Sequence, residues 1–245
     1  MNSIVQRIAA DGSVVTLSVP AEAGAMRWFG ATRVVGPAIN RSFGLAQAGQ
    51  HKVIPKKIFP GGRVQAFRRV GFDLVLYEAS DRSDSCLVWA GPYNEVTTWF
   101  GGPAPREAVL DHLVSLLLFT DSPSGARFGP DPAASLEQQS TSVYGWADDV
   151  VLMIRDARTS RDQLPPWRGL PMGDAELWKE RLDLGQEQAE ELAGSPFEWR
   201  YVMASPTAVT EIIFPLQPGA YRAAAASALA RVDAVVQGVR ASWSG

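Results

Sequence analysis

Hydrophobic and polar residues alternate with the two-residue period of a β-strand in several short segments of the first 100 residues. These segments are 13–19, 63–70, 72–78, 86–89 and 96–100. Turn-forming residues separate them, for example Asp11-Gly12 and Pro60-Gly61-Gly62. Short strands with regular turns between them are typical of an antiparallel sheet or a small barrel. In residues 21–50, glycines and a proline interrupt every pattern, so we expect a loop with short strands there.

A helical period follows at residues 105–119. Pro105 suits the first helical position, and the apolar residues recur on one face; they are Val109, Leu110, Leu113, Leu116 and Leu117. Residues 121–134 are rich in Pro, Gly, Ser and Asp, which is typical of a boundary between domains. Further on, the patterns predict a strand at 150–154, a charged helix at 174–192, a hairpin at 199–203 and 209–214, and a last helix at 220–241.

The predicted fold class is therefore α+β. An antiparallel β-rich part closed by a helix occupies residues 1–120, a linker occupies 121–135, and a second sheet-and-helix part occupies 136–245. Residues 86–118 and 199–239 share the order strand, turn, strand, prolines, helix. This order indicates duplication of a ββα unit, with coincidence as the alternative because a hairpin followed by a helix is common. In element order alone, the repeat is similar to that of secretion chaperones built from two sheet-and-helix halves.

Composition narrows the class of protein. The chain has 245 residues, of which 46% are hydrophobic and 20% charged, as in a globular protein with a sizeable core. Cys86 is the single cysteine and His51 and His112 are the only histidines, so no disulfide framework, His-rich metal cage or cofactor is expected. The sequence lacks a secretion signal and an apolar run long enough to cross a membrane. We therefore expect a cytoplasmic protein with no membrane partner, and the Arg- and Ala-rich composition is typical of bacteria.

Charge is distributed unequally along the chain. No acidic residue occurs between Glu22 and Asp73, so this window has a net charge of +9. The rest of the chain has a net charge of −12, which gives −3 overall. The same window holds nine cations: Arg27, Arg33, Arg41, Lys52, Lys56, Lys57, Arg63, Arg68 and Arg69. A basic N-terminal face fits an acidic protein, a second copy of this chain or a nucleic acid, and a solvated face without a partner is the plain alternative. The sequence pI near 5.5 argues against a dedicated nucleic-acid binder.

Tryptophan is the second candidate for binding. Among the eight tryptophans, four fall in predicted loops or on the charged helix: Trp146, Trp167, Trp178 and Trp243. An exposed Trp is enriched in the energetic centres of interfaces, although a Trp in a loop more often packs onto its own core. We therefore add Trp146 and Trp167 to the nine cations as candidate binding residues.

Catalytic motifs give little support to an enzyme. No glycine-rich phosphate loop, zinc-protease helix or G-x-S-x-G nucleophile turn is present. The weak candidates are Cys86 and His112, which would have to form a thiolate–imidazole pair. The sequence therefore predicts a non-catalytic bacterial protein-binding component, that is, an adaptor, chaperone or structural subunit that pairs with another protein or with itself. The alternatives are an enzyme with a site at Cys86 and His112, or a polyanion-binding protein.

Overall fold

The computed structural model describes residues 2–37, 39–147, 149–215 and 225–245. It is mostly β, with 53% of residues in strands and 20% in helices, and twelve strands form one large antiparallel sheet. The predicted α+β fold class is therefore wrong, and so is the description of the fold as two ββα halves. The reason is that residues 27–36, 39–47 and 175–181 form strands of the large sheet where loop or helix is predicted from local patterns.

The chain divides into two compact units. Unit 1 comprises Met1–Arg7, Val14–Trp28 and Val143–Gly245, and unit 2 comprises Ile8–Ser13 and Phe29–Ser142. The predicted linker at 121–135 lies inside unit 2, where it contains the end of one strand and all of another.

Unit 2 is built on six neighbouring strands of the large sheet. In spatial order they are β3 (Arg27–Gly36), β4 (Ile39–Gln47), β8 (Asn94–Gly101), β7 (Asp84–Ala90), β6 (Phe72–Glu78) and β5 (Arg63–Arg69). The strands predicted at 63–70, 72–78, 86–89 and 96–100 are confirmed as β5 to β8. Residues 21–50 are not mainly loop, because β3 and β4 pair from Gly30↔Leu45 to Gly36↔Ile39. A Cβ at Gly36 would collide with the Leu136 side chain, so glycine permits this close approach.

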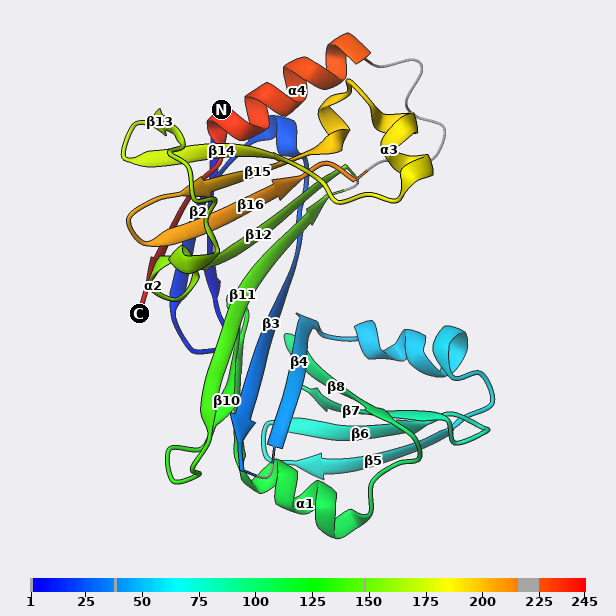
Figure 1. The fold of residues 1–245 in the computed structure, drawn as a ribbon. Coiled ribbons are helices and arrows are strands. Elements are labelled where there is room, and N and C mark those ends of the chain that lie inside the picture. The colour runs from blue at the N-terminus through cyan, green and yellow to red at the C-terminus, as the bar shows by residue number, and fades with distance from the viewer. Residues whose placement is uncertain (1, 38, 148, 216–224) are drawn as a thin grey trace. The chain divides into compact units, whose positions relative to one another are not determined.

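The sheet of unit 2 has a hydrophobic core on each face. Helix α1 (Glu107–Ser115) and the hairpin of β9 (Leu117–Ser122) and β10 (Gly125–Pro130) pack on one face, around Phe43, Trp89 and Phe128. The short helices η2 (Gln50–Val53) and η3 (Ile54–Ile58) pack on the other face. Figure 1 shows α1 and the η2–η3 segment on opposite sides of β5–β8. The helix predicted at 105–119 ends early, because Leu117 pairs with Pro130 in the hairpin.

Unit 1 holds the other six strands of the large sheet. In spatial order they are β13 (Leu170–Met172), β14 (Ala175–Arg181), β15 (Trp199–Ala204), β16 (Ala208–Ile213), β12 (Val150–Asp156) and β11 (Glu137–Ala147). The first residues of β11 belong to unit 2. It also contains a second sheet of β1 (Asn2–Ile8), β2 (Val14–Pro20) and β17 (Arg240–Ser244). The short helical elements are η1 (Ala21–Ala23), α2 (Ala157–Ser160), η4 (Arg161–Gln163), α3 (Gln186–Leu192) and η5 (Pro196–Glu198).

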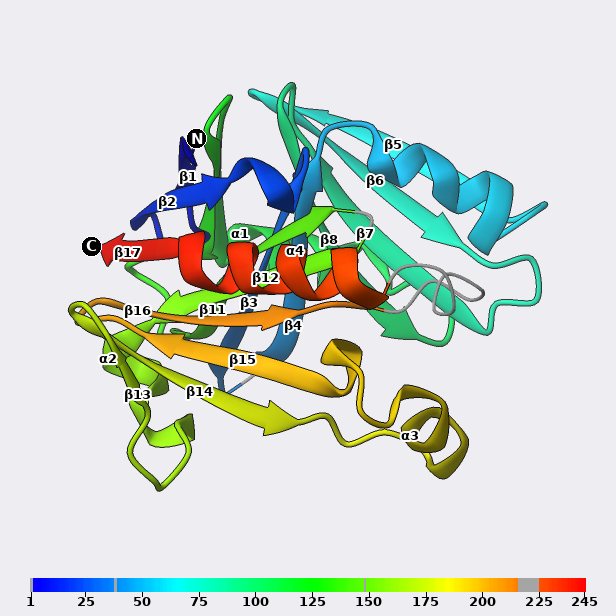
Figure 2. The ribbon, with the colours of Figure 1, turned by 90° about the horizontal axis from the view of Figure 1, so that it is seen from above.

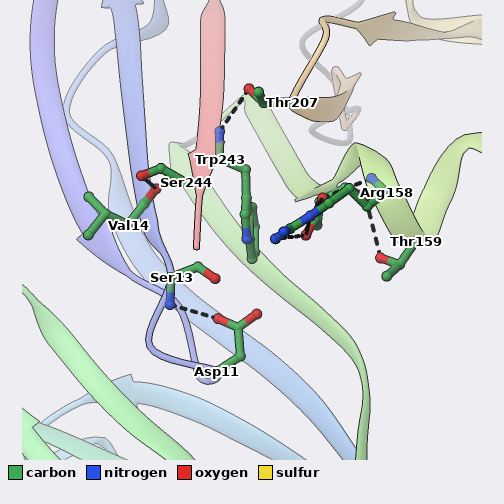
Figure 3. A network of polar contacts seen from close by, with 9 residues as sticks. Asp11, Ser13, Val14, Arg158, Thr159, Thr207, Trp243 and Ser244 are labelled. Carbon is green, nitrogen blue, oxygen red and sulfur yellow. Dashed lines mark hydrogen bonds and ion pairs between the residues drawn. The ribbon is translucent and has the colours of Figure 1, made fainter.

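The end of the chain is fixed within unit 1. Helix α4 (Ala225–Gly238) buries Val232, Val235 and Val236 and packs on β2 and η1 (Figure 2). It leads into β17, where the Trp243 N–H donates to Thr207 Oγ1 at 3.2 Å and Ser244 Oγ donates to the Val14 carbonyl at 3.1 Å (Figure 3). The helix predicted at 220–241 is thus shorter at its C-terminal end, and residues 220–224 lie outside the described residues.

The helix predicted at 174–192 is also wrong in its first half. Residues Ala175–Arg181 form β14, which pairs along its length with β15, from Glu176↔Ala204 to Arg181↔Trp199.

None of the helices among the described residues combines the length and the apolar character that a membrane-spanning helix needs.

Candidate binding groove

The last strand of the large sheet in unit 2, β5, has a free edge. All seven of its residues are exposed, and they pair on one side with β6, from Arg63↔Glu78 to Arg69↔Phe72. On the other side, no backbone hydrogen bond joins β5 to any residue that the structure describes. The two strands are joined by Val70-Gly71, where Gly71 adopts a φ of +85°, as tight hairpins require. The strand therefore presents a full row of backbone groups for pairing.

A groove of about 880 Å³ runs beside this strand, between β5–β7 and α1. We call it the edge groove. Leu74, Leu76 and Leu87 form its floor on β6 and β7, and Phe67 and Gln65 of β5 line it at the free edge. Helix α1 contributes Glu107, Leu110, Asp111 and Val114, and Ala104-Pro105 precede the helix. The volume lies in the range of about 300–1,000 Å³ that is typical of ligand sites.

Charged residues occupy both ends of the edge groove. At one end, Arg69 of β5 approaches Asp111 of α1, with Nη2 and Oδ1 3.5 Å apart. At the other end, Arg82 Nε donates to Glu78 Oε1 at 3.0 Å, and the Ala104 N–H donates to the same oxygen at 3.3 Å. Desolvation alone would raise the pKa of Glu78, but these hydrogen bonds and the charges of Arg82 and Arg63 together lower it. Glu78 is therefore an anion at neutral pH.

The opposite face of the sheet is closed. Glu95 of β8 is buried and accepts hydrogen bonds from the Gly49 N–H at 2.8 Å and the His51 N–H at 2.5 Å. His51 Nδ1 lies 2.6 Å from the same carboxylate. These contacts hold the start of the η2–η3 segment, whose Ile54 packs with Phe59 over Cys86. The carboxylate therefore serves as an anchor for this segment.

The two weak catalytic candidates are not brought together. Cys86 is fully buried under the η2–η3 segment, and burial raises the pKa of its thiol to about 12. His112 is exposed on α1, which packs through Leu110 and Leu113 on the other face of the sheet. The thiol has neither an imidazole partner from α1 nor access to solvent, so the arrangement offers no thiolate nucleophile.

The nine predicted cations lie on different surfaces. Arg27 belongs to unit 1 and the other eight to unit 2. Because side chains alternate along a strand, Arg63 and Arg69 share the groove face of β5 and Arg68 points to the other face. Lys52, Lys56 and Lys57 are exposed on the η2–η3 segment. Of the nine cations, β5 carries the three arginines Arg63, Arg68 and Arg69, and β3 carries Arg27 and Arg33.

Arg33 and Arg41 are held by neighbouring groups within unit 2. The Arg33 Nε donates to Asn40 Oδ1 at 2.9 Å, and Arg41 Nη1 donates to the Trp99 carbonyl at 2.8 Å. The Arg41 guanidinium also lies 4.1 Å from the centre of the Phe100 ring. These contacts fix the two guanidinium groups on the sheet, so they are less available to a partner than the arginines of β5.

The predicted binding tryptophans lie in unit 1. Trp146 on β11 is 46% exposed, and Trp167 in the loop before β13 is 55% exposed. Apart from Arg69, the residues of the edge groove are not among the candidate binding residues, and Leu110 and Val114 of α1 are the clearest cases. The apolar stripe of the predicted helix contained Leu110, but only the fold places it opposite an edge strand.

Comparison with protein-family models, with curated proteins and with solved structures finds no match for this chain. Among the residues that the structure describes, no group of three or more His, Cys, Asp or Glu side chains is arranged to hold a metal ion.

Proposed function

We propose that the chain is a non-catalytic protein-binding component, of the adaptor, chaperone or structural-subunit kind, that captures an acidic partner protein through the edge of unit 2. The observation that carries this proposal is strand β5. All seven of its residues are exposed, three of them are arginines, and its outer edge pairs with no described strand. Val64 and Phe67 are exposed between the arginines on opposite faces of β5, and Val70 is exposed in the turn that follows, so each face of the strand is both apolar and cationic. Such a surface favours an acidic polypeptide.

The arginines of β5 are only weakly neutralised. Arg68 is 93% exposed and its Nε lies 3.9 Å from Asp73 Oδ1, which is a solvent-screened pair of little energetic weight. Arg63 forms no ion pair with a described residue, although its charge reaches Glu78. Arg63 and Arg68 are thus available to carboxylates of a partner, whereas Arg69 would have to exchange its contact with Asp111 for one with the partner.

The test is selection of peptides from a random displayed library on the purified full chain. We expect acidic peptides to be enriched, and their affinity to fall at least about tenfold in the R63E/R68E/R69E variant. The matched control is K52E/K56E/K57E, which makes the same change in charge on the η2–η3 segment and should retain binding. Failure to enrich acidic peptides, or equal loss in both variants, would contradict the proposal.

The same proteins distinguish the polyanion alternative. A 20-nucleotide single-stranded DNA should bind the chain weakly or not at all. If it binds in 50 mM salt with an affinity that falls by orders of magnitude at 200 mM, and depends on the β5 arginines, then the partner is a nucleic acid rather than a protein.

A further inference from the structure

We infer that the partner binds by strand addition: an extended peptide pairs its backbone with the free edge of β5 and inserts apolar side chains into the edge groove. This inference rests on the proposed function and specifies how the partner is held. An open sheet edge beside a groove is the combination that such recognition uses, because backbone pairing gives affinity and the groove selects alternate side chains.

The edge groove opens toward the free edge of the sheet. On the groove face, Leu87 of β7 is 1% exposed, and Leu74 and Leu76 of β6 are 3% and 4% exposed. Phe67 of β5 is 37% exposed, and Gln65 beside it is exposed as well. Exposure thus rises from the inner strands to the outermost one. A strand added outside β5 would place its groove-facing side chains against Phe67 and Gln65, where apolar surface is still in contact with water.

The register of β5 defines what the added strand should contain. Arg63, Gln65, Phe67 and Arg69 point to the groove face, because they pair with Glu78, Leu76, Leu74 and Phe72 of β6. Residues directly opposite them on an added strand point to the same face. Carboxylates suit the two positions opposite Arg63 and Arg69, and apolar side chains suit the two positions between them. The partner segment therefore has the pattern acidic-x-apolar-x-apolar-x-acidic, which reads the same in either chain direction.

A second copy of this chain is a poor occupant of the edge. Antiparallel pairing of two β5 strands centred on Ala66 places Arg63 of one copy opposite Arg69 of the other at both ends. Like charges directly opposite each other destabilise a strand pair. The arginines therefore disfavour self-association through β5 and favour an acidic segment of another protein.

The first test alters only the ligand. The fluorescent peptide Glu-Thr-Leu-Thr-Leu-Thr-Glu places its acids and leucines on one face of a strand, and Glu-Leu-Thr-Thr-Thr-Leu-Glu moves the leucines to the other face. We expect the first peptide to bind at least about tenfold more tightly. N-methylation of alternate residues blocks one edge of the peptide. Of the two alternative methylated sets, one should abolish binding and the other should preserve it, because a strand offers alternate N–H groups to each side.

The second test alters the groove. V114W fills it from α1, whereas V109W places the same side chain on an exposed position of α1 that does not line the groove. V114W should weaken binding of the alternating peptide about tenfold, and V109W should leave it unchanged, with both variants checked for a native circular dichroism spectrum. The methylated peptides test strand addition on the wild-type chain, so the inference stays testable even if V114W fails to fold.

The outcomes separate the two proposals. If acidic peptides bind through the β5 arginines but ignore the leucine arrangement, N-methylation and V114W, then strand addition is wrong and the proposed function stands. If no acidic peptide binds, both proposals fall. If light scattering shows a dimer of the free chain that R63E/R68E/R69E strengthens or dissolves, the occupant of β5 is a second copy and the inference is overturned.

Discussion

The two strands that end the large sheet are built in opposite ways. In unit 1, β13 has three residues, and its middle residue, Pro171, has no N–H to offer. In unit 2, β5 has seven residues without a proline, all exposed. Short strands and prolines are the means by which proteins prevent unwanted pairing at a sheet edge. Unit 1 uses both of them at β13, whereas unit 2 uses neither at β5.

The loop before β13 adds further protection in unit 1. Trp178 Nε1 of β14 donates to the Trp167 carbonyl at 2.7 Å, and the Gly169 N–H donates to Glu176 Oε2 at 3.2 Å. A Cβ at Gly169 would lie 2.8 Å from the Trp178 ring, so the loop backbone packs directly on the indole. The loop that leads into β13 is thus tied to β14, whereas no backbone hydrogen bond from a described residue ties the outer side of β5. This difference is why we place the partner at β5.

The largest effect should come from removing the tie in unit 1. Trp178 is buried with Ala157, Val202 and Val209, so Trp178→Ala should lower the free energy of unfolding by about 3–5 kcal/mol. Urea denaturation measures it, with the half-exposed Trp146→Ala as the control expected to cost less than about 1 kcal/mol. Amide exchange should also accelerate in residues 170–177. A loss below about 1 kcal/mol would mean that the indole does not secure this edge.

A smaller effect should follow from releasing the closed face of unit 2. Glu95→Gln places an amide group against the N–H donors of Gly49 and His51 and should cost about 2 kcal/mol. Local opening of the η2–η3 segment should then expose Cys86, so that labelling of the thiol by a disulfide reagent at pH 8 becomes roughly 30-fold faster.

His112→Ala is the control for the labelling experiment, because His112 is exposed on α1 and packs on the opposite face. It should leave the labelling rate unchanged. A change in that rate with His112→Ala, or none with Glu95→Gln, would contradict the assignment of the two faces.

Local patterns predict strands β5 to β8 of unit 2, but they miss β9, β10 and most of β3 and β4, and they do not place β5 at the edge of the sheet. The alternation in residues 63–78 is sufficient for the hairpin of β5 and β6, because two-residue periodicity and Val70-Gly71 are local signals. Whether β5 is an edge strand depends on which strands pair across the chain. The same holds for residues 175–181, whose charged composition resembles a helix but whose pairing with β15 makes them a strand.

The candidate site could be predicted only in part for the same reason. The nine cations are visible in the sequence as a cluster, but side chains on neighbouring strand positions point to opposite faces. Arg68 and Arg69 are therefore adjacent in sequence and separated by the sheet. Cys86 and His112 are separated likewise, since α1 crosses to the face opposite the buried thiol. No local signal gives the face on which a helix packs.

A still smaller effect on stability should depend on pH, and it should come from Glu78 at one end of the edge groove. The pKa of Glu78 is lowered in the folded protein, so its contribution is present above the unfolded-state value of about 4.3 and is lost as the pH falls through the folded value. Glu78→Gln should therefore have a lower melting temperature than the wild type at pH 7, and the difference should shrink below pH 4. A difference that is constant from pH 7 to pH 3 would show that the charge of Glu78 is not involved. Arg82→Gln should reproduce part of the effect, because Arg82 donates to this carboxylate.

The smallest effect on stability should come from two arginines of the proposed binding strand, Arg63 and Arg68. Arg63→Ala and Arg68→Ala should each change the free energy of unfolding by no more than about 0.5 kcal/mol, because the Arg68–Asp73 pair is solvent-screened and Arg63 forms no ion pair with a described residue. The same variants should weaken the alternating acidic peptide, Arg63→Ala more than Arg68→Ala, since Arg63 shares the groove face and Arg68 points to the other. Chemical denaturation and fluorescence anisotropy on the same samples give both quantities. If the substitutions destabilise the fold by more than about 1 kcal/mol and leave peptide affinity unchanged, the arginines maintain the edge strand, and β5 is protected in its own way rather than kept open for a partner.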